Sequence, residues 1–330
     1  MSVRLDSPAA TPAPPGADVP SRPKAALTFG DRMFRGLATA ATSVSLIIVV
    51  LTLVFLVDGA RPALRHSGVV DFFTTNLWNP TVGRFGVFGL LIGTGIIATI
   101  AMVVAVPLAL GMALFINEYA PHRLSQMLTS VVDVLAALPS LLFGAWGFFA
   151  FQDRLVPTAR YLADHFNAIP IFSLTSPNAS LTQSSFVAGM VVALMILPII
   201  TSVSRDVMAQ VPREQCEGAL ALGGTRWGMI RDVILPFGRS GIVGATLLGF
   251  GRALGETIAV ALLISISFKA NPHILERGAG SIAALIATKF GEAGSLERSG
   301  LIAAGLALFL VTLAVNMLAR RIVGKSALKV

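Results

Sequence analysis

An arginine and a glutamate stand inside an apolar stretch that is long enough to cross a membrane. Arg252 and Glu256 belong to the segment Gly251-Arg252-Ala253-Leu254-Gly255-Glu256-Thr257. Placing an arginine at the centre of a membrane helix costs roughly 2.5 to 3.5 kcal/mol, and such residues usually face a bundle interior or an aqueous cavity. A guanidinium stays charged when buried and donates several hydrogen bonds in one plane, which is the chemistry of oxyanion recognition.

Helical geometry predicts how this pair is arranged. Arg252 and Glu256 are four residues apart, so we expect them to be neighbours on one helix face, where opposite charges lower the cost of insertion. A nearby carboxylate would also weaken the grip on an anion and allow its release. Gly251 and Gly255 form a small-residue pair on the adjacent face and would let another helix approach closely.

Two alternatives remain open for these residues. The charges can form a structural ion pair that fixes helix register and never meets a substrate. Thr257 can donate its hydroxyl to an anion or bond back to its own helix. Arg252 lies eleven positions after Gly241, a helical rise of about 16 Å and half of a hydrocarbon core of about 30 Å, so we expect the pair near mid-bilayer.

The composition is that of an integral membrane protein. Hydrophobic residues make up 55% of the 330 residues, and charged residues only 13%. The net charge of +8 is divided among segments between apolar runs, which argues against a nucleic-acid partner. Cys216 is the single cysteine, the four histidines lack metal-ligand spacing, and no nucleophile and base are paired. We therefore expect no disulfide, no metal site and no enzymatic activity.

Apolar runs predict an all-α fold with six membrane spans. Residues 1–28 are rich in proline and small residues and are expected to form a disordered N-terminal tail before a transmembrane domain of residues 29–330. Fifteen Lys and Arg residues fall on the side of the termini and nine on the other, which favours a multi-pass membrane protein with two cytoplasmic termini. The expected spans are 37–57, 87–116, 128–151, 185–204, 241–267 and 299–319.

The segment 206–239 between the fourth and fifth spans predicts a helical hairpin on the cytoplasmic face. Two helical patterns are separated by Gly223 and Gly224, which suit the end of the first helix. Thr225 suits the cap of a second helix that ends at Pro236. An amphipathic hairpin in this position is a surface for a partner protein.

The spacing in this hairpin resembles the coupling motif of ATP-binding-cassette (ABC) importer permeases. That motif reads Glu-Ala-Ala, three residues, Gly, nine residues, Ile, one residue and Leu-Pro. Its counterparts here are Glu217-Gly218-Ala219, Gly223 and Val233-Ile234-Leu235-Pro236. Gly218 and Val233 depart from the motif, and both remain small or β-branched apolar residues. An ordinary hairpin with chance spacing is the alternative.

The segment around Arg252 is similar to the signature of phosphate importer permeases. The continuation Ile258-Ala259-Val260 resembles the PstC type, whereas the PstA type usually continues Ala-Pro-Leu. The Gly-Asn that often follows in the PstC type is missing here. Further matches cover most of the chain: Ile92-Gly93-Thr94, Glu118-Tyr119-Ala120-Pro121, Leu138-Pro139-Ser140, and Met195-Ile196-Leu197-Pro198-Ile199-Ile200-Thr201.

The resemblance implies a type I ABC importer permease fold and an alternating-access transporter for inorganic phosphate. Its implied partners are a PstA-type permease in a heterodimer, two copies of an ATPase that binds ATP and magnesium, an extracytoplasmic phosphate-binding protein and membrane lipid. No cofactor is expected on this chain. Substrate translocation is assigned to Arg252, Glu256 and Thr257, ATPase coupling to Glu217, Ala219, Gly223, Leu235 and Pro236, and helix packing to Gly251 and Gly255.

Two rival functions remain at this point. The first is a permease of the same architecture for another oxyanion, such as sulfate or molybdate. The second is an anion channel or secondary carrier that needs no ATPase.

Overall fold

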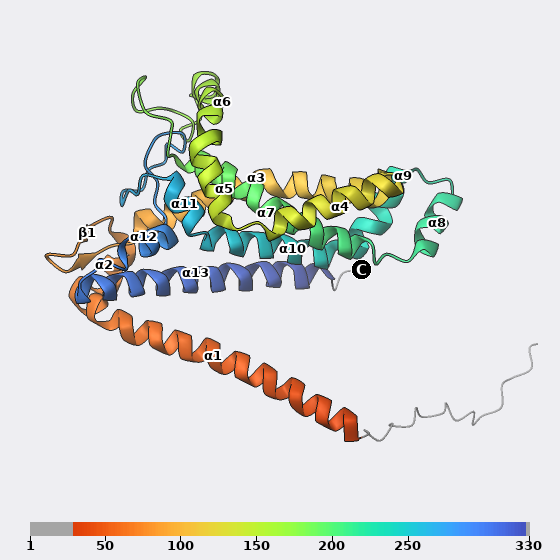
Figure 1. Ribbon diagram of the computed structural model, residues 1–330, viewed down its shortest axis with the longest axis horizontal. Coiled ribbons are helices and arrows are strands. Elements are labelled where there is room, and N and C mark those ends of the chain that lie inside the picture. The colour runs from red at the N-terminus through yellow and green to blue at the C-terminus, as the bar shows by residue number, and fades with distance from the viewer. Residues whose placement is uncertain (1–28, 328–330) are drawn as a thin grey trace, which may run out of the picture. The chain divides into compact units, whose positions relative to one another are not determined.

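A computed structural model of the chain describes residues 29–327 and consists mainly of helices (Figure 1). The expected disordered tail, residues 1–28, lies outside the described residues. The chain divides into two compact units, residues 1–52 and 53–330. Helix α1 (Phe29–Ser67) is the first element, and every residue from Phe29 to Thr52 is exposed. Its apolar surface there suits contact with lipid.

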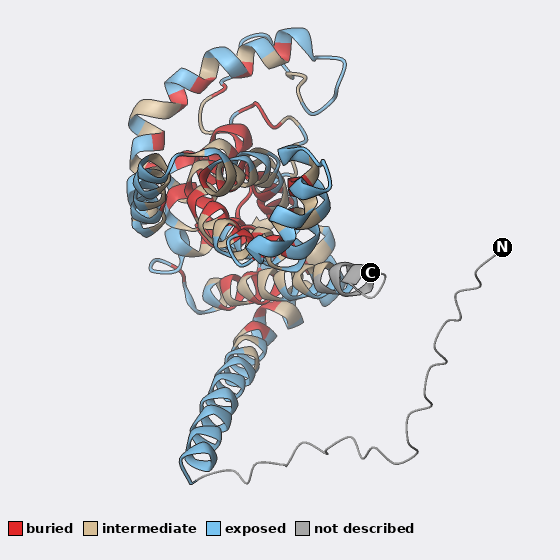
Figure 2. Cartoon of the chain, turned by 90° about the vertical axis from the view of Figure 1, so that its right-hand side faces the viewer, coloured by how far each residue is buried: buried red, intermediate tan, exposed pale blue. Residues whose placement is uncertain are grey.

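Helix α7 (Ser185–Met208) forms the centre of the second unit, and α3 (Phe88–Leu114), α4 (His122–Ala137) and α10 (Leu235–Gly255) pack around it. Figure 2 shows the buried residues concentrated in this bundle. Alanines on α3 recur every three or four residues and form a narrow ridge against which α7 packs closely. These alanines are Ala98, Ala101, Ala105 and Ala109.

A second core joins the end of α1 to α13 (Ser295–Ala327). Gly59 faces Ile302, and the Ser299 hydroxyl donates to the Gly59 carbonyl at 2.7 Å. The same hydroxyl accepts from the backbone N–H of Ala63 at 3.0 Å. This core also includes residues of α2 (Val69–Thr74) and α12 (Ile282–Lys289).

Within residues 29–327, five helices are long and apolar enough to cross a membrane, and one bent helix pair adds a sixth possible span. The expected third span, 128–151, falls within this bent pair and is not one continuous helix. Helix α4 ends at Ala137, and the chain bends by 91° before α5 (Ser140–Trp146), the π turn η2 (Gly147–Phe151) and α6 (Gln152–His165). Pro139 explains the break, because a proline disfavours helical geometry at the preceding residue, here Leu138 with ψ of 137°.

The expected fifth span, 241–267, is also interrupted. Helix α10 stops at Gly255, and the short helix α11 (Ile258–Leu263) begins after two non-helical residues. Glu256 has an extended backbone with ψ of 126°. The fifth span is therefore a broken helix.

The remaining elements lie at the two ends of the bundle (Figure 1). One end carries α8 (Arg213–Ala221), α9 (Arg226–Met229) and the π turns η1 (Phe115–Tyr119) and η3 (Ile230–Ile234). We call it the loop end. The opposite end carries the antiparallel strands β1 (Trp78–Asn79) and β2 (Arg84–Phe85).

Candidate translocation site and coupling loop

Arg252 lies in the last turn of α10, and its side chain is exposed. Among residues 29–327, no hydrogen bond or ion pair reaches its guanidinium. The last carbonyl groups of a helix carry a partial negative charge, which stabilises a cation at this position. The side chain is therefore free to bind an anion.

The packing of α10 on α7 fixes how deep Arg252 lies. The two helices run antiparallel, with Gly241 against Val207 and Gly249 against Ile200. A Cβ on Gly249 would lie 2.6 Å from Ile200 Cδ1, so the glycine is required for this approach. Arg252 follows Gly249 by about one turn and so lies level with the middle of α7. The mid-bilayer depth expected from the sequence stays a prediction.

The expected pairing of Arg252 with Glu256 on one helix face is wrong. Glu256 lies beyond the end of α10, and only 7% of its surface is exposed. Its Oε1 accepts from the backbone N–H of Ala259 at 3.4 Å. Glu256 therefore caps α11, and no ion pair with Arg252 forms within the described chain.

Thr257 satisfies the other side of the same break. Its hydroxyl donates to the Gly255 carbonyl at 2.9 Å, so it bonds to its own backbone, one of the two alternatives for this residue. A broken helix in an apolar environment is stable only when side chains or water satisfy the freed backbone groups. Glu256 and Thr257 do this for the fifth span, which is a reason for their presence independent of any substrate.

Gly251 and Gly255 contact no helix of the described chain. A Cβ on either residue would meet nothing within 4 Å. They belong to a face of α10 with a helical repeat, which we call the open face of α10. Its members are exposed except for the half-buried Gly251: Ser240, Gly244, Leu248, Gly251, Arg252 and Gly255. The helix that would approach these glycines is therefore not found in the described chain, and close packing against a helix of another chain stays a prediction.

The broken third and fifth spans meet beside this site. Helix α11 packs on α5, where a Cβ on Gly144 would lie 2.6 Å from Ala259 Cα. The backbone N–H of Ala259 is also the group that donates to Glu256 Oε1. Discontinuous helices that meet within a membrane bundle are a recurring construction of substrate sites in transporters. The sequence motifs did not indicate that α5 takes part.

Residues 206–239, which we call the coupling loop after the role expected from the sequence, form the first helix of the expected hairpin. Helix α8 ends at Ala221, and Gly223 follows two residues later with a φ of +86°, which is strained for any residue with a side chain. The N–H of Gly223 donates to the Leu220 carbonyl at 3.0 Å, and the N–H of Gly224 donates to the Ala219 carbonyl at 3.2 Å. These contacts form a helix C-cap. The Thr225 hydroxyl accepts from the Gly228 N–H at 3.1 Å and caps α9 as expected.

The second helix of the hairpin does not end at Pro236, contrary to expectation. Helix α9, η3 and α10 form one span from Arg226 to Gly255. Pro236 lies in the first turn of α10, directly after the π turn, where a missing N–H is tolerated. The loop is thus joined rigidly to the helix that carries Arg252.

The expected coupling residues divide between two surfaces of the loop. One surface packs against an apolar cluster of buried residues, which we call the loop core: Ala113, Met208, Val211, Met229, Ile230, Ile234 and Ile242. The expected coupling residues Ala219 and Leu235 belong to this surface, together with Cys216. Glu217, Gly223 and Pro236 are exposed. Leu222 next to Gly223 is 91% exposed, and no residue of α8 is buried. The hairpin therefore presents an open surface.

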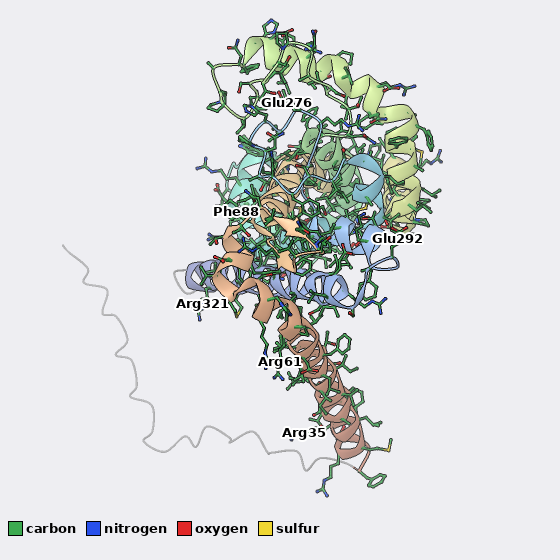
Figure 3. All side chains as sticks on the ribbon, turned by 90° about the vertical axis from the view of Figure 1, so that its left-hand side faces the viewer. Arg35, Arg61, Phe88, Glu276, Glu292 and Arg321 are labelled. Atoms are coloured by element: carbon green, nitrogen blue, oxygen red, sulfur yellow. The ribbon has the colours of Figure 1, made fainter. Side chains whose placement is uncertain are left out.

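The loops at the opposite end are tied together by a buried carboxylate. Glu276 lies among these loops near α6 (Figure 3). Its Oε1 accepts from the Thr175 hydroxyl at 2.7 Å and from the Thr175 backbone N–H. No sequence motif indicated this contact. Residues 29–327 contain no group of three or more His, Cys, Asp or Glu side chains that could hold a metal ion.

The helical bundle, its two broken spans and its exposed hairpin define a class, the permease subunits of ABC importers. The family described as Binding-protein-dependent transport system inner membrane component matches residues 105–326. A crystal structure of a bacterial ABC transporter involved in the import of the acidic polysaccharide alginate aligns with 89% of this chain and 99% of that chain. Its TM-score is 0.55 at 15% sequence identity, which supports the fold alone.

Two relatives indicate which type of permease within this family the chain resembles. Phosphate transport system permease protein PstC 2 of Mycobacterium tuberculosis is 40% identical over 89% of this chain and 92% of its own length. Phosphate transport system permease protein PstC of Haemophilus influenzae is 37% identical over 90% of this chain and 94% of its own length. The chain belongs to the binding-protein-dependent transport system inner membrane components, as a PstC-type permease. It is a multi-pass inner-membrane protein.

Proposed function

We propose that this chain is the membrane-spanning permease subunit of an ATP-driven phosphate importer and forms half of its translocation pathway. The observation that carries the proposal is Arg252, an exposed guanidinium without a partner in the described chain, at the end of a broken helix level with the middle of α7. The names of the relatives support phosphate as the anion.

The proposed assembly contains four other protein subunits. A PstA-type permease completes the heterodimer and contacts the open face of α10, where glycines permit close approach. Two copies of an ABC ATPase bind the exposed hairpin, and ATP and magnesium bind to those copies. A phosphate-binding protein delivers the ion at the opposite end. The distribution of Lys and Arg favours a cytoplasmic loop end and two cytoplasmic termini.

The mechanism is alternating access. Closure of the ATPase pair displaces the loop 206–239, and because α9 and α10 are one helix, the displacement reaches Arg252 directly. The cavity then opens toward the binding protein, and Arg252 donates hydrogen bonds to the arriving phosphate. The negative end of the α10 dipole limits the strength of that grip, so the ion can leave.

Uptake of labelled phosphate by the reconstituted complex tests this function. We expect uptake that requires ATP and that persists in excess sulfate or molybdate. Competition by sulfate or molybdate as effective as that by unlabelled phosphate would assign the permease to another oxyanion. Uptake that survives nucleotide depletion would instead indicate a channel or carrier.

A further inference from the structure

Asn117 lies in the π turn η1, where α3 passes into α4. Its side-chain amide donates to the Arg205 carbonyl at 2.8 Å, near the end of α7. Arg205 lies three residues before Met208, the last residue of α7, and the coupling loop begins at this point of the chain. π turns inside membrane helices often mark functional positions. Asn117 is therefore a side-chain link between the α3–α4 connection and the helix that enters the loop.

The other side of η1 is held by the second half of the loop. Arg226, the first residue of α9, donates to the Glu118 carbonyl at 3.3 Å. The same guanidinium stands 5.9 Å from the centre of the Tyr119 ring, within the range of a cation–π contact. The turn η1 is thus held between the end of α7 and the start of α9.

The contact between α7 and α4 continues toward the middle of the bundle. Ser202 on α7 donates to Asp133 of α4 at 3.0 Å. The Arg205 side chain, 12% exposed, donates to Ser202 and to Asp206 and has a nitrogen 3.8 Å from Asp133. Helix α4 ends at Ala137, four positions after Asp133, at the break before Pro139. These contacts favour joint movement of the loop-end parts of α4 and α7.

We propose that Asn117 is a positioning residue for coupling: it locks η1 to the end of α7, so that a displacement of the loop carries α4 together with α7. The inference rests on the proposed function, because it names how that movement spreads. It places the hinge of the third span at Leu138-Pro139, beyond the locked part. Asn117 acts through its contact with the Arg205 carbonyl.

The test is the amount of phosphate transported per ATP hydrolysed by the reconstituted complex. We expect Asn117→Ala to assemble with its ATPase and hydrolyse ATP, but to transport about threefold less phosphate per ATP, or still less. Asn117→Asp has nearly the same volume but places a carboxylate against the Arg205 carbonyl, so we expect at least as large a loss. Gln126→Ala is the matched control, because the Gln126 amide is exposed and contacts only His122 of its own helix. Ratios for both Asn117 variants equal to that of Gln126→Ala would overturn the proposal.

A distance measurement in an otherwise unmodified complex covers the case in which both variants fail to assemble. Spin labels at Gln126→Cys on α4 and Ala209→Cys at the end of α7, with Cys216→Ser, report on the locked pair. We expect the same distance distribution in the nucleotide-free and ATP-bound complexes. A distance that changes with nucleotide would overturn the proposal. A wild-type complex that transports no phosphate would contradict the proposed function. A complex that transports phosphate but shows a label-to-label distance that changes with nucleotide would contradict only the proposed role of Asn117.

Discussion

Arg252 lies in the last turn of α10, whereas Glu256 lies in the break that follows it, and the two side chains do not form an ion pair. The Arg252 side chain is exposed at the helix end, whereas the buried Glu256 carboxylate accepts from the Ala259 N–H at 3.4 Å. The two charges of the signature therefore do different work. Arg252 is available to an anion, and Glu256 maintains the shape of the broken span.

Substitutions at Glu256 separate a capping role from a charge role. Glu256→Gln keeps a side-chain oxygen that can accept from Ala259, so we expect little loss of stability. Glu256→Ala removes the cap, and we expect a loss of about 1 kcal/mol in the free energy of unfolding. Thermal unfolding of the purified complex measures both. Equal destabilisation by Gln and Ala would show that the charge, rather than the cap, is what matters.

The contact between the two broken spans depends on Gly144. Because its Cβ would meet the backbone of Ala259, we expect Gly144→Val to destabilise the subunit by roughly 1 to 3 kcal/mol. Gly95→Ala is the control, since this helical glycine has open space around it and alanine favours a helix. Denaturation in detergent should rank Gly144→Val well below wild type and Gly95→Ala at or above it. Comparable stability of the two variants would contradict the close approach of α5 and α11.

The C-cap of α8 depends on the left-handed backbone of Gly223. A side chain there costs about 1 to 2 kcal/mol, so we expect Gly223→Val to distort the hairpin and weaken attachment of the ATPase. Gly218→Ala is the control, because this glycine is helical, has open space around it and is replaced by the residue that the coupling motif carries. Co-purification of the ATPase is the measurement. Full attachment and coupled transport in Gly223→Val would count against the docking role.

Chemical labelling of Cys216, the single cysteine, tests whether α8 packs against the loop core. Burial raises the pKa of the Cys216 thiol, and the Glu118 and Glu217 carboxylates act in the same direction. Because the thiolate is the reactive form, we expect maleimide labelling at neutral pH to be slow and to keep increasing at pH values where an ordinary thiol has levelled off. Leu222→Cys in a Cys216→Ser background provides the exposed comparison. Identical pH profiles for the two thiols would mean that Cys216 is not packed against the loop core.

The features that the sequence predicted and those it missed differ in physical origin. Gly223 and Thr225 act through local backbone geometry, and their caps were predictable from residue type alone. The break at Glu256 was missed because the apolar run continues through α11, so hydropathy sees one span.

Tertiary contacts account for the other omissions. The amide of Asn117 bonds to a carbonyl 88 residues away, and Gly144 fits against Ala259 of a distant helix. Neither contact has a local pattern. Pro139 was a partial signal, because its effect on Leu138 was predictable, whereas the 91° bend depends on how α4 and α5 pack.

Arg252 provides the most direct test of the account. Uptake of labelled phosphate would be compared in reconstituted complexes that carry wild-type, Arg252→Gln or Arg35→Gln subunits; Arg35 is an exposed arginine near the start of α1 (Figure 3). Loss of a charge-assisted hydrogen-bond donor costs about 1.5 to 3 kcal/mol, so we expect uptake by the assembled Arg252→Gln complex to fall roughly 10- to 100-fold, with Arg35→Gln near wild type. Normal uptake by an assembled Arg252→Gln complex would contradict the translocation role of Arg252.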